Sequence, residues 1–146
     1  MGRVTAAIDL PFSAERIWRV ATRVEDMPRW LPEVVEAELL DSWLRKGSRI
    51  RLRLGPGTGN AEITGTVVGC REPEAFEIAG SGGPLGVKVW TALKAAGPGV
   101  TRVSLELELS TPPFLGFIAK EAERRINAEL PASLERFRAL MEAEPA

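Results

Sequence analysis

The sequence predicts an α+β fold in which an antiparallel sheet of about seven strands packs against one long C-terminal helix. Short segments of alternating apolar residues follow one another along most of the chain, separated by turns rich in glycine and proline. The segment Ile8–Leu40 places two short helices between the first two strands, and a three- and four-residue apolar repeat fills the C-terminal part. We see no internal repeat or linker, so we expect one domain over residues 1–146.

The N-terminal segment predicts a strand followed by two short helices. Val4 to Leu10 alternates apolar and polar positions, as a half-buried strand does, and Pro11 ends it. Ser13 then has the side chain of a helix N-cap. One helical face follows, made of Ile17, Trp18, Val20, Ala21 and Val24. A second, shorter helix is expected to begin at Glu25 and to be closed by Pro32.

The middle of the chain predicts six further strands. Their expected bounds are Val34–Trp43, Ser48–Leu54, Ala61–Cys70, Phe76–Ala79, Val87–Leu93 and Val100–Leu109. The last of these alternates most clearly. Because short turns join consecutive strands, the sheet should be antiparallel. The stretches GPGTGN (55–60) and GSGGPLG (80–86) are interpreted as flexible loops.

The final helix is expected from about Phe114 to Glu142, after two prolines. Its apolar stripe is Leu115, Ile118, Ala122, Ile126, Leu130, Leu134, Phe137 and Met141. Such a stripe has one obvious place to be buried, across one face of the sheet. Pro131 lies inside the stripe and predicts a kink, because proline lacks the backbone donor and clashes with the preceding turn.

Composition excludes several classes of function. Hydrophobic residues make up 45% and charged residues 27% of the chain, with a formal net charge of −1, which is typical of a globular protein. The charges form no basic stripe, so nucleic acid is not an expected partner. No apolar run approaches the roughly 20 residues of a membrane-spanning helix, and the N-terminus has no apolar block like that of a signal peptide. We therefore expect a cytoplasmic protein without an integral membrane segment.

The chain contains no histidine and no tyrosine, and its one cysteine is Cys70. Without histidine, Ser-His-Asp and Cys-His catalysis and the common zinc and non-haem iron sites are excluded. A single cysteine allows no internal disulfide. We therefore predict no metal and no cofactor, and we assign no catalytic residue. Any chemistry must depend on Asp, Glu, Lys, Arg, Ser, Thr or Cys70.

Several motifs together carry a family resemblance. They are V-x-A-x-I-x-L-P-x-S-A-E-R-I-W from Val4, D-M-P-R-W-L-P-x-V from Asp26, the Gly47 hairpin, G-V-T-R-V-S-L-E-L from Gly99, and the long C-terminal helix. In this order they resemble the polyketide cyclase/dehydrase and lipid-transport superfamily, the START-like or SRPBCC group. The resemblance implies a helix-grip fold, in which a curved sheet wraps around the C-terminal helix and leaves a cavity between them. It implies no shared catalytic residue.

Under that fold, two groups of residues are candidates for ligand binding. The short second helix offers Met27, Trp30 and Leu31, and the start of the long helix offers Phe114, Phe117 and Ile118 as an entrance lip facing the glycine-rich loop 81–86. Trp30 could equally plug the bottom of the core, because pockets and cores use the same residues.

Polar candidates lie on the strands expected to flank the cavity. These are Glu62 and Thr64, together with the aromatic Trp90. A buried Glu62 would be the best available general acid or base, although an exposed strand carboxylate is more common. Arg49, Arg51 and Arg53 share one face of a strand. We expect that face to point outward, because burying three like charges without partners is too costly.

Three hypotheses of function follow. The first is a module that binds a hydrophobic small molecule, such as a lipid, an isoprenoid or a polyketide-like aromatic, in the internal cavity. The second is a polyketide cyclase or dehydratase using Glu, Arg or Thr residues of the cavity, which an acidic residue with hydrogen-bonding neighbours in the cavity would favour. The third is an interaction protein with a vestigial cavity, which a contiguous exposed apolar patch would favour. The sequence defines neither the ligand nor the oligomeric state.

Overall fold

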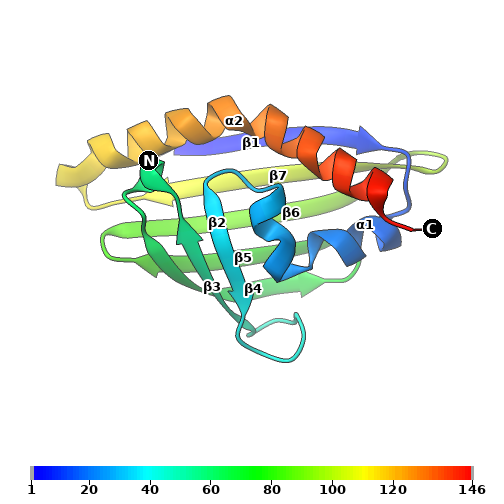
Figure 1. Cartoon of the computed structure of the whole chain (residues 1–146), viewed down its shortest axis with the longest axis horizontal. Coiled ribbons are helices and arrows are strands. Elements are labelled where there is room, and N and C mark those ends of the chain that lie inside the picture. Colours follow the sequence, from blue (N-terminus) through cyan, green and yellow to red (C-terminus); the bar gives the residue numbers. More distant parts are fainter. Residues whose placement is uncertain (1, 146) are drawn as a thin grey trace.

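The computed structural model describes residues 2–145, which form one curled sheet of seven antiparallel strands with helices on one side (Figure 1). The spatial order of the strands is β1-β7-β6-β5-β4-β3-β2. Their bounds are β1 Gly2–Leu10, β2 Val34–Leu39, β3 Arg49–Leu54, β4 Glu62–Arg71, β5 Ala75–Gly82, β6 Leu85–Gly97 and β7 Val100–Ser110. Because β1 and β2 occupy opposite edges, the segment between them has to cross from one edge of the sheet to the other.

That crossing segment contains the two predicted helices. They are the α-helix α1, Ala14–Ala21, and the 3₁₀-helix η1, Val24–Arg29. The Ser13 hydroxyl accepts a hydrogen bond from the backbone N–H of Arg16 at 3.2 Å, which confirms the predicted N-cap. The second element is a 3₁₀-helix with Pro28 inside it. A proline inside this turn removes one backbone donor, which keeps the element short.

The long helix α2, Gly116–Ala143, follows the short 3₁₀ turn η3, Pro113–Leu115, and lies along the sheet near β1 (Figure 1). It continues through Pro131 without interruption. Its buried residues are Ala119, Ala122, Ile126, Leu130, Ser133, Leu134, Phe137 and Met141. The predicted stripe therefore packs on the sheet from Ala122 onward, whereas Leu115 and Ile118 at its start are only half-buried.

Alternation along the strands decides which side chains face the helix. In β7, Val103, Leu105, Leu107 and Leu109 are buried, as expected. In β3, Ile50, Leu52 and Leu54 are buried, and the three arginines between them are exposed. Arg53 pairs with Glu36 at 2.9 Å and Arg51 lies 3.7 Å from Glu38 on the neighbouring strand. The prediction that this arginine face points outward is confirmed.

Two predicted loops differ in the structure. Residues 80–86 do not form a flexible loop, because β5 extends to Gly82, β6 begins at Leu85, and only Gly83 and Pro84 make the turn. The glycines of β5 serve close approach: a Cβ on Gly82 would lie 1.7 Å from the Glu62 carbonyl oxygen. Residues 55–60 contain a single 3₁₀ turn, η2, Pro56–Thr58.

This close approach predicts that Gly82→Ala lowers the free energy of unfolding by about 1–3 kcal/mol, because the β4 backbone must move to admit the methyl group. The matched control is Gly116→Ala on α2, where an added Cβ meets no heavy atom within 4 Å. We expect that control to leave stability unchanged or to raise it by up to about 1 kcal/mol. Urea-induced unfolding of both variants measures the difference, and equal stability of the two would contradict the prediction.

Candidate functional site

An apolar pocket lies between the inner face of the sheet, the η1 segment and α2. Its wall includes Met27, Trp30, Leu31, Glu33 and Val34 before and within β2, Leu52, Leu54, Phe76, Ile78, Val87, Val89, Thr91, Leu107 and Leu109 on the other strands, Thr58 of η2, and Ile126 of α2. We call this the internal pocket. It encloses about 40 Å³. Because a pocket for a drug-sized molecule holds about 300–1,000 Å³, this conformation is closed to a ligand of that size.

Trp30 forms a wall of the internal pocket and also belongs to the core. Its side chain is 1% exposed, and its ring lies 4.7 Å from that of Phe137, centroid to centroid. Its backbone carbonyl accepts hydrogen bonds from the Ser133 hydroxyl and from the Arg136 guanidinium, both on α2. The two sequence hypotheses for this residue therefore describe the same arrangement, since α2 holds the pocket wall in place.

A larger, open hollow lies next to the internal pocket, between η2, the β5–β6 turn and the start of α2. We call it the outer cleft; its volume is about 720 Å³. Thr58 lines both the internal pocket and the outer cleft, so η2 separates the two spaces. Phe117 and Ile118 line the outer cleft from α2, and Phe117 is 69% exposed.

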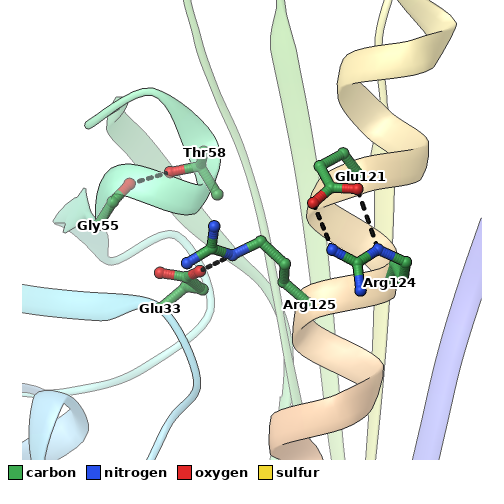
Figure 2. Close-up of polar contacts among 6 residues, drawn as sticks. All are labelled: Glu33, Gly55, Thr58, Glu121, Arg124 and Arg125. Carbon is green, nitrogen blue, oxygen red and sulfur yellow. Dashed lines mark hydrogen bonds and ion pairs between the residues drawn. The ribbon is translucent and has the colours of Figure 1, made fainter.

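The Glu33 carboxylate lies beside the η2 region, which separates the internal pocket from the outer cleft (Figure 2). We call this region the boundary of the pocket. Glu33 lines the internal pocket with a side chain only 9% exposed, and Arg125 Nε of α2 lies 3.3 Å from its Oε1. The Glu33 backbone has a φ of 61°, unusual for a residue with a side chain. Its carbonyl accepts the N–H of Gly55 at 2.9 Å. A Cβ on Gly55 would lie 2.8 Å from Glu33 Oε2, so a larger residue there would displace the carboxylate from this position.

The η2 turn closes the internal pocket on the side of the outer cleft. The Thr58 hydroxyl donates to the Gly55 carbonyl at 2.9 Å, and the backbone N–H groups of Thr58 and Asn60 donate to that same oxygen at 3.1 Å. The turn is thus organised around Gly55, the residue whose N–H is bound to Glu33. Movement of η2 away from the pocket would therefore involve Glu33, Gly55 and Thr58 together.

Sequence reasoning missed Glu33. In the run W-L-P-E-V-V it resembles an ordinary turn acid after a proline, and no alternation pattern marks it as buried. The available signal is its position as a single acid within an apolar run. Arg125 was missed for a similar reason, since exposed arginines are common on a helix.

The structure corrects three polar or aromatic candidates. Val89 and Thr91 point inward, so Trp90 lies on the outer face of the sheet, where the Arg3 guanidinium stacks 5.1 Å from its ring. Thr64 is exposed on the same outer face. Strand alternation excludes both from the internal pocket. Glu62 is exposed as well and lines the outer cleft, so the hypothesis of a buried Glu62 is wrong.

The remaining candidates divide between the two spaces. Met27, Trp30 and Leu31 line the internal pocket, whereas Phe117 and Ile118 line the outer cleft. Phe114 is 78% exposed, and the two spaces do not include it. No helix within residues 2–145 is long and apolar enough to cross a bilayer.

A curled antiparallel sheet closed by a long C-terminal helix, with two short helices between its first strands, is the helix-grip architecture of START-like proteins. The chain belongs to the polyketide cyclase/dehydrase and lipid transport family, whose profile matches residues 1–142. The resemblance inferred from the sequence motifs is thereby confirmed. No curated protein matches the sequence.

Solved structures support the fold. The Zhui aromatase/cyclase from Streptomyces sp. R1128 has a TM-score of 0.78 and 12% identity, over 97% of this chain and 93% of that one. A START superfamily protein from Mycobacterium smegmatis has a TM-score of 0.71 and 19% identity, over 97% of each chain. A conserved protein from Geobacillus kaustophilus has a TM-score of 0.70 and 12% identity, over 97% and 96%. At these identities the likeness establishes the fold alone.

The boundary ion pair yields a stability prediction. Arg125→Met removes the cation beside a nearly buried carboxylate, so we expect the free energy of unfolding to fall by about 1–3 kcal/mol. Arg124→Met is the matched control on the next residue of α2, because its pair with Glu121 is exposed (Figure 2) and such pairs contribute about 0–1 kcal/mol. Urea unfolding compares the two. In the double variant Glu33→Leu/Arg125→Met much of the loss should be recovered, and an equal effect of the two single variants would refute the assignment.

Cys70 yields a prediction of reactivity. Burial, and secondarily the charge of Glu72, raises the pKa of the half-buried Cys70 thiol. A smaller fraction of thiolate forms at pH 8, so iodoacetamide should alkylate the folded protein several-fold more slowly than the same chain in urea. Mass spectrometry follows the modification. Glu72→Gln should react faster than the unmodified protein, and equal rates for folded and unfolded chains would contradict the prediction.

Proposed function

We propose that this protein binds a hydrophobic small molecule, such as a lipid, an isoprenoid or a polyketide-like aromatic, in the internal pocket, which the ligand reaches from the outer cleft. The observation that carries the proposal is the position of η2: one short turn separates an apolar pocket from an open cleft that shares Thr58 with it. Membership of a family described by polyketide cyclisation and lipid transport agrees with this class of ligand.

The closed volume of about 40 Å³ means that the pocket must enlarge on binding. Burying an aromatic group with about 200 Å² of apolar surface contributes roughly 5 kcal/mol at about 25 cal/mol per Å². Displacing η2 breaks the contacts around Gly55 and the Glu33–Arg125 pair, at a cost of about 1–3 kcal/mol. A ligand that binds only the open conformation shifts the protein toward it when the apolar surface that it buries also offsets the freedom lost on association.

A second candidate function is a cyclase or dehydratase reaction. Glu33 supports it, because a carboxylate beside an apolar pocket, with Arg125 as its neighbour, is positioned to move a proton on a bound substrate. Turnover of a polyketide-like substrate that is lost in Glu33→Gln while binding persists would establish this function. The exposed Phe114 and Phe117 fit the interaction hypothesis, but Phe117 also lines the outer cleft, so we assign it to the ligand entrance.

The proposal is tested by native mass spectrometry of the purified protein, with organic extraction and identification of any co-purifying compound. Titration with a panel of lipids and polyaromatic compounds, followed by tryptophan fluorescence, provides the second measurement, because Trp30 lines the internal pocket. If no compound is retained and no member of the panel changes the fluorescence, the proposal is rejected.

A pocket-filling variant makes the location specific. Val87→Phe adds volume at a half-buried position that lines the internal pocket, so we expect binding at least about tenfold weaker than that of the unmodified protein. Val68→Phe, an exposed position on β4, is the matched control and should bind as the unmodified protein does. Equal weakening by both substitutions would place the ligand elsewhere. Thermal unfolding of both variants confirms that they are folded.

A further inference from the structure

Two side chains that line the internal pocket each carry a buried polar atom without a hydrogen-bond partner. Among residues 2–145, the buried side-chain nitrogen or oxygen atoms that lack a partner are Trp30 Nε1 and Glu33 Oε1. Both side chains line the internal pocket. Arg125 Nε lies 3.3 Å from Glu33 Oε1 as an ion pair, but not in the geometry of a hydrogen bond.

The rest of the core does not share this feature. The other buried tryptophan, Trp18, donates its indole N–H to Glu72 at 3.1 Å. The buried hydroxyls of Ser48, Thr101 and Ser133 each donate to a backbone carbonyl. Buried polar groups in proteins are nearly always paired, so an unpaired donor and an unpaired acceptor on one pocket require an explanation.

We propose that these two atoms are the polar contacts of the ligand, and that the ligand is a hydroxylated hydrophobic molecule. This inference rests on the proposed function. The ligand hydroxyl donates a hydrogen bond to the Glu33 carboxylate, and a ligand oxygen accepts one from the Trp30 indole N–H. The apolar body of the ligand then meets the leucine, isoleucine, valine and phenylalanine side chains that make up most of the remaining wall.

The charges around Glu33 define this class further. A ligand carboxylate or phosphate would be repelled by the Glu33 carboxylate. A ligand amine would compete with Arg125, which already neutralises that charge. A neutral hydroxyl avoids both costs, and its hydrogen bond to a carboxylate is stronger than one between neutral groups. Phenols and aliphatic alcohols share this chemistry.

The test uses three ligands of similar size that differ in one group. 2-Naphthol both donates and accepts, 2-methoxynaphthalene accepts only, and 2-methylnaphthalene does neither. Competition with a polarity-sensitive dye gives the three affinities. We expect 2-naphthol to bind at least about tenfold more tightly than 2-methylnaphthalene, with 2-methoxynaphthalene between them. The same comparison of 1-octanol with 1-methoxyoctane distinguishes a phenol site from an alcohol site.

Two variants assign the contacts to their atoms. In Glu33→Leu, 2-naphthol should lose its advantage over 2-methoxynaphthalene, because the acceptor of its proton is gone. In Trp30→Phe, 2-methoxynaphthalene should lose its advantage over 2-methylnaphthalene, because the indole donor is gone. Glu135→Leu, which changes an exposed carboxylate of α2 that lines neither the internal pocket nor the outer cleft, is the matched control and should preserve the order of all three ligands.

The outcomes separate this inference from the proposed function. Equal affinities of the three ligands, or a preference that persists in both Glu33→Leu and Trp30→Phe, would overturn the hydroxyl assignment and leave hydrophobic binding intact. If the dye binds and none of the ligands displaces it, the hydroxyl assignment alone is overturned. Absence of binding by the dye and by all of the ligands would overturn both. If Glu33→Leu does not fold, the order of the three affinities on the unmodified protein still tests the hydroxyl assignment. Glu33→Gln, which keeps the shape of the side chain, should then reduce the preference for 2-naphthol.

Discussion

The contact between Trp30 and α2 is the interaction on which the site depends. The segment from β1 to β2 crosses between opposite edges of the sheet, and its end is fixed where Ser133 and Arg136 donate to the Trp30 carbonyl and where Phe137 packs against the indole ring. Because one wall of the internal pocket is held by the helix that also covers the sheet, the pocket and the core share a single packing arrangement. A substitution that alters the packing of the core therefore also alters the wall of the pocket.

The boundary of the internal pocket follows from this arrangement. Trp30 is fixed by α2, and three residues later Glu33 adopts a backbone φ of 61° and meets Arg125 of the same helix. The backbone of Glu33 in turn binds Gly55, from which η2 is organised. A nearly buried carboxylate and a small turn therefore stand where an apolar pocket meets solvent. Polar contacts at this position can be exchanged for contacts with a ligand, and they can also be broken when the pocket opens.

Chain folding brings these residues together from three separate regions. Glu33 follows η1, Gly55 and Thr58 belong to the β3–β4 connection, and Arg125 lies on α2. No local sequence pattern marks any of these residues as part of a site. Together they form the polar contacts at the boundary of the internal pocket. Phe117 and Ile118, by contrast, belong to the predicted entrance segment and line the outer cleft. The glycines of β5, expected from the sequence to lie in a flexible loop, instead permit two strand backbones to approach closely.

The sequence by itself determined the sheet, the helices and the inward and outward faces of β3 and β7, because apolar periodicity and capping act locally along the chain. The N-cap at Ser13, the outward Arg49 face and the buried stripe of α2 are examples. The strand bounds and the placement of Trp90 needed the actual pairing, since a shift of one residue exchanges the two faces. Only the tertiary structure decided that Glu33 and Trp30 share one pocket, because burial and long-range pairing depend on residues far apart in the chain.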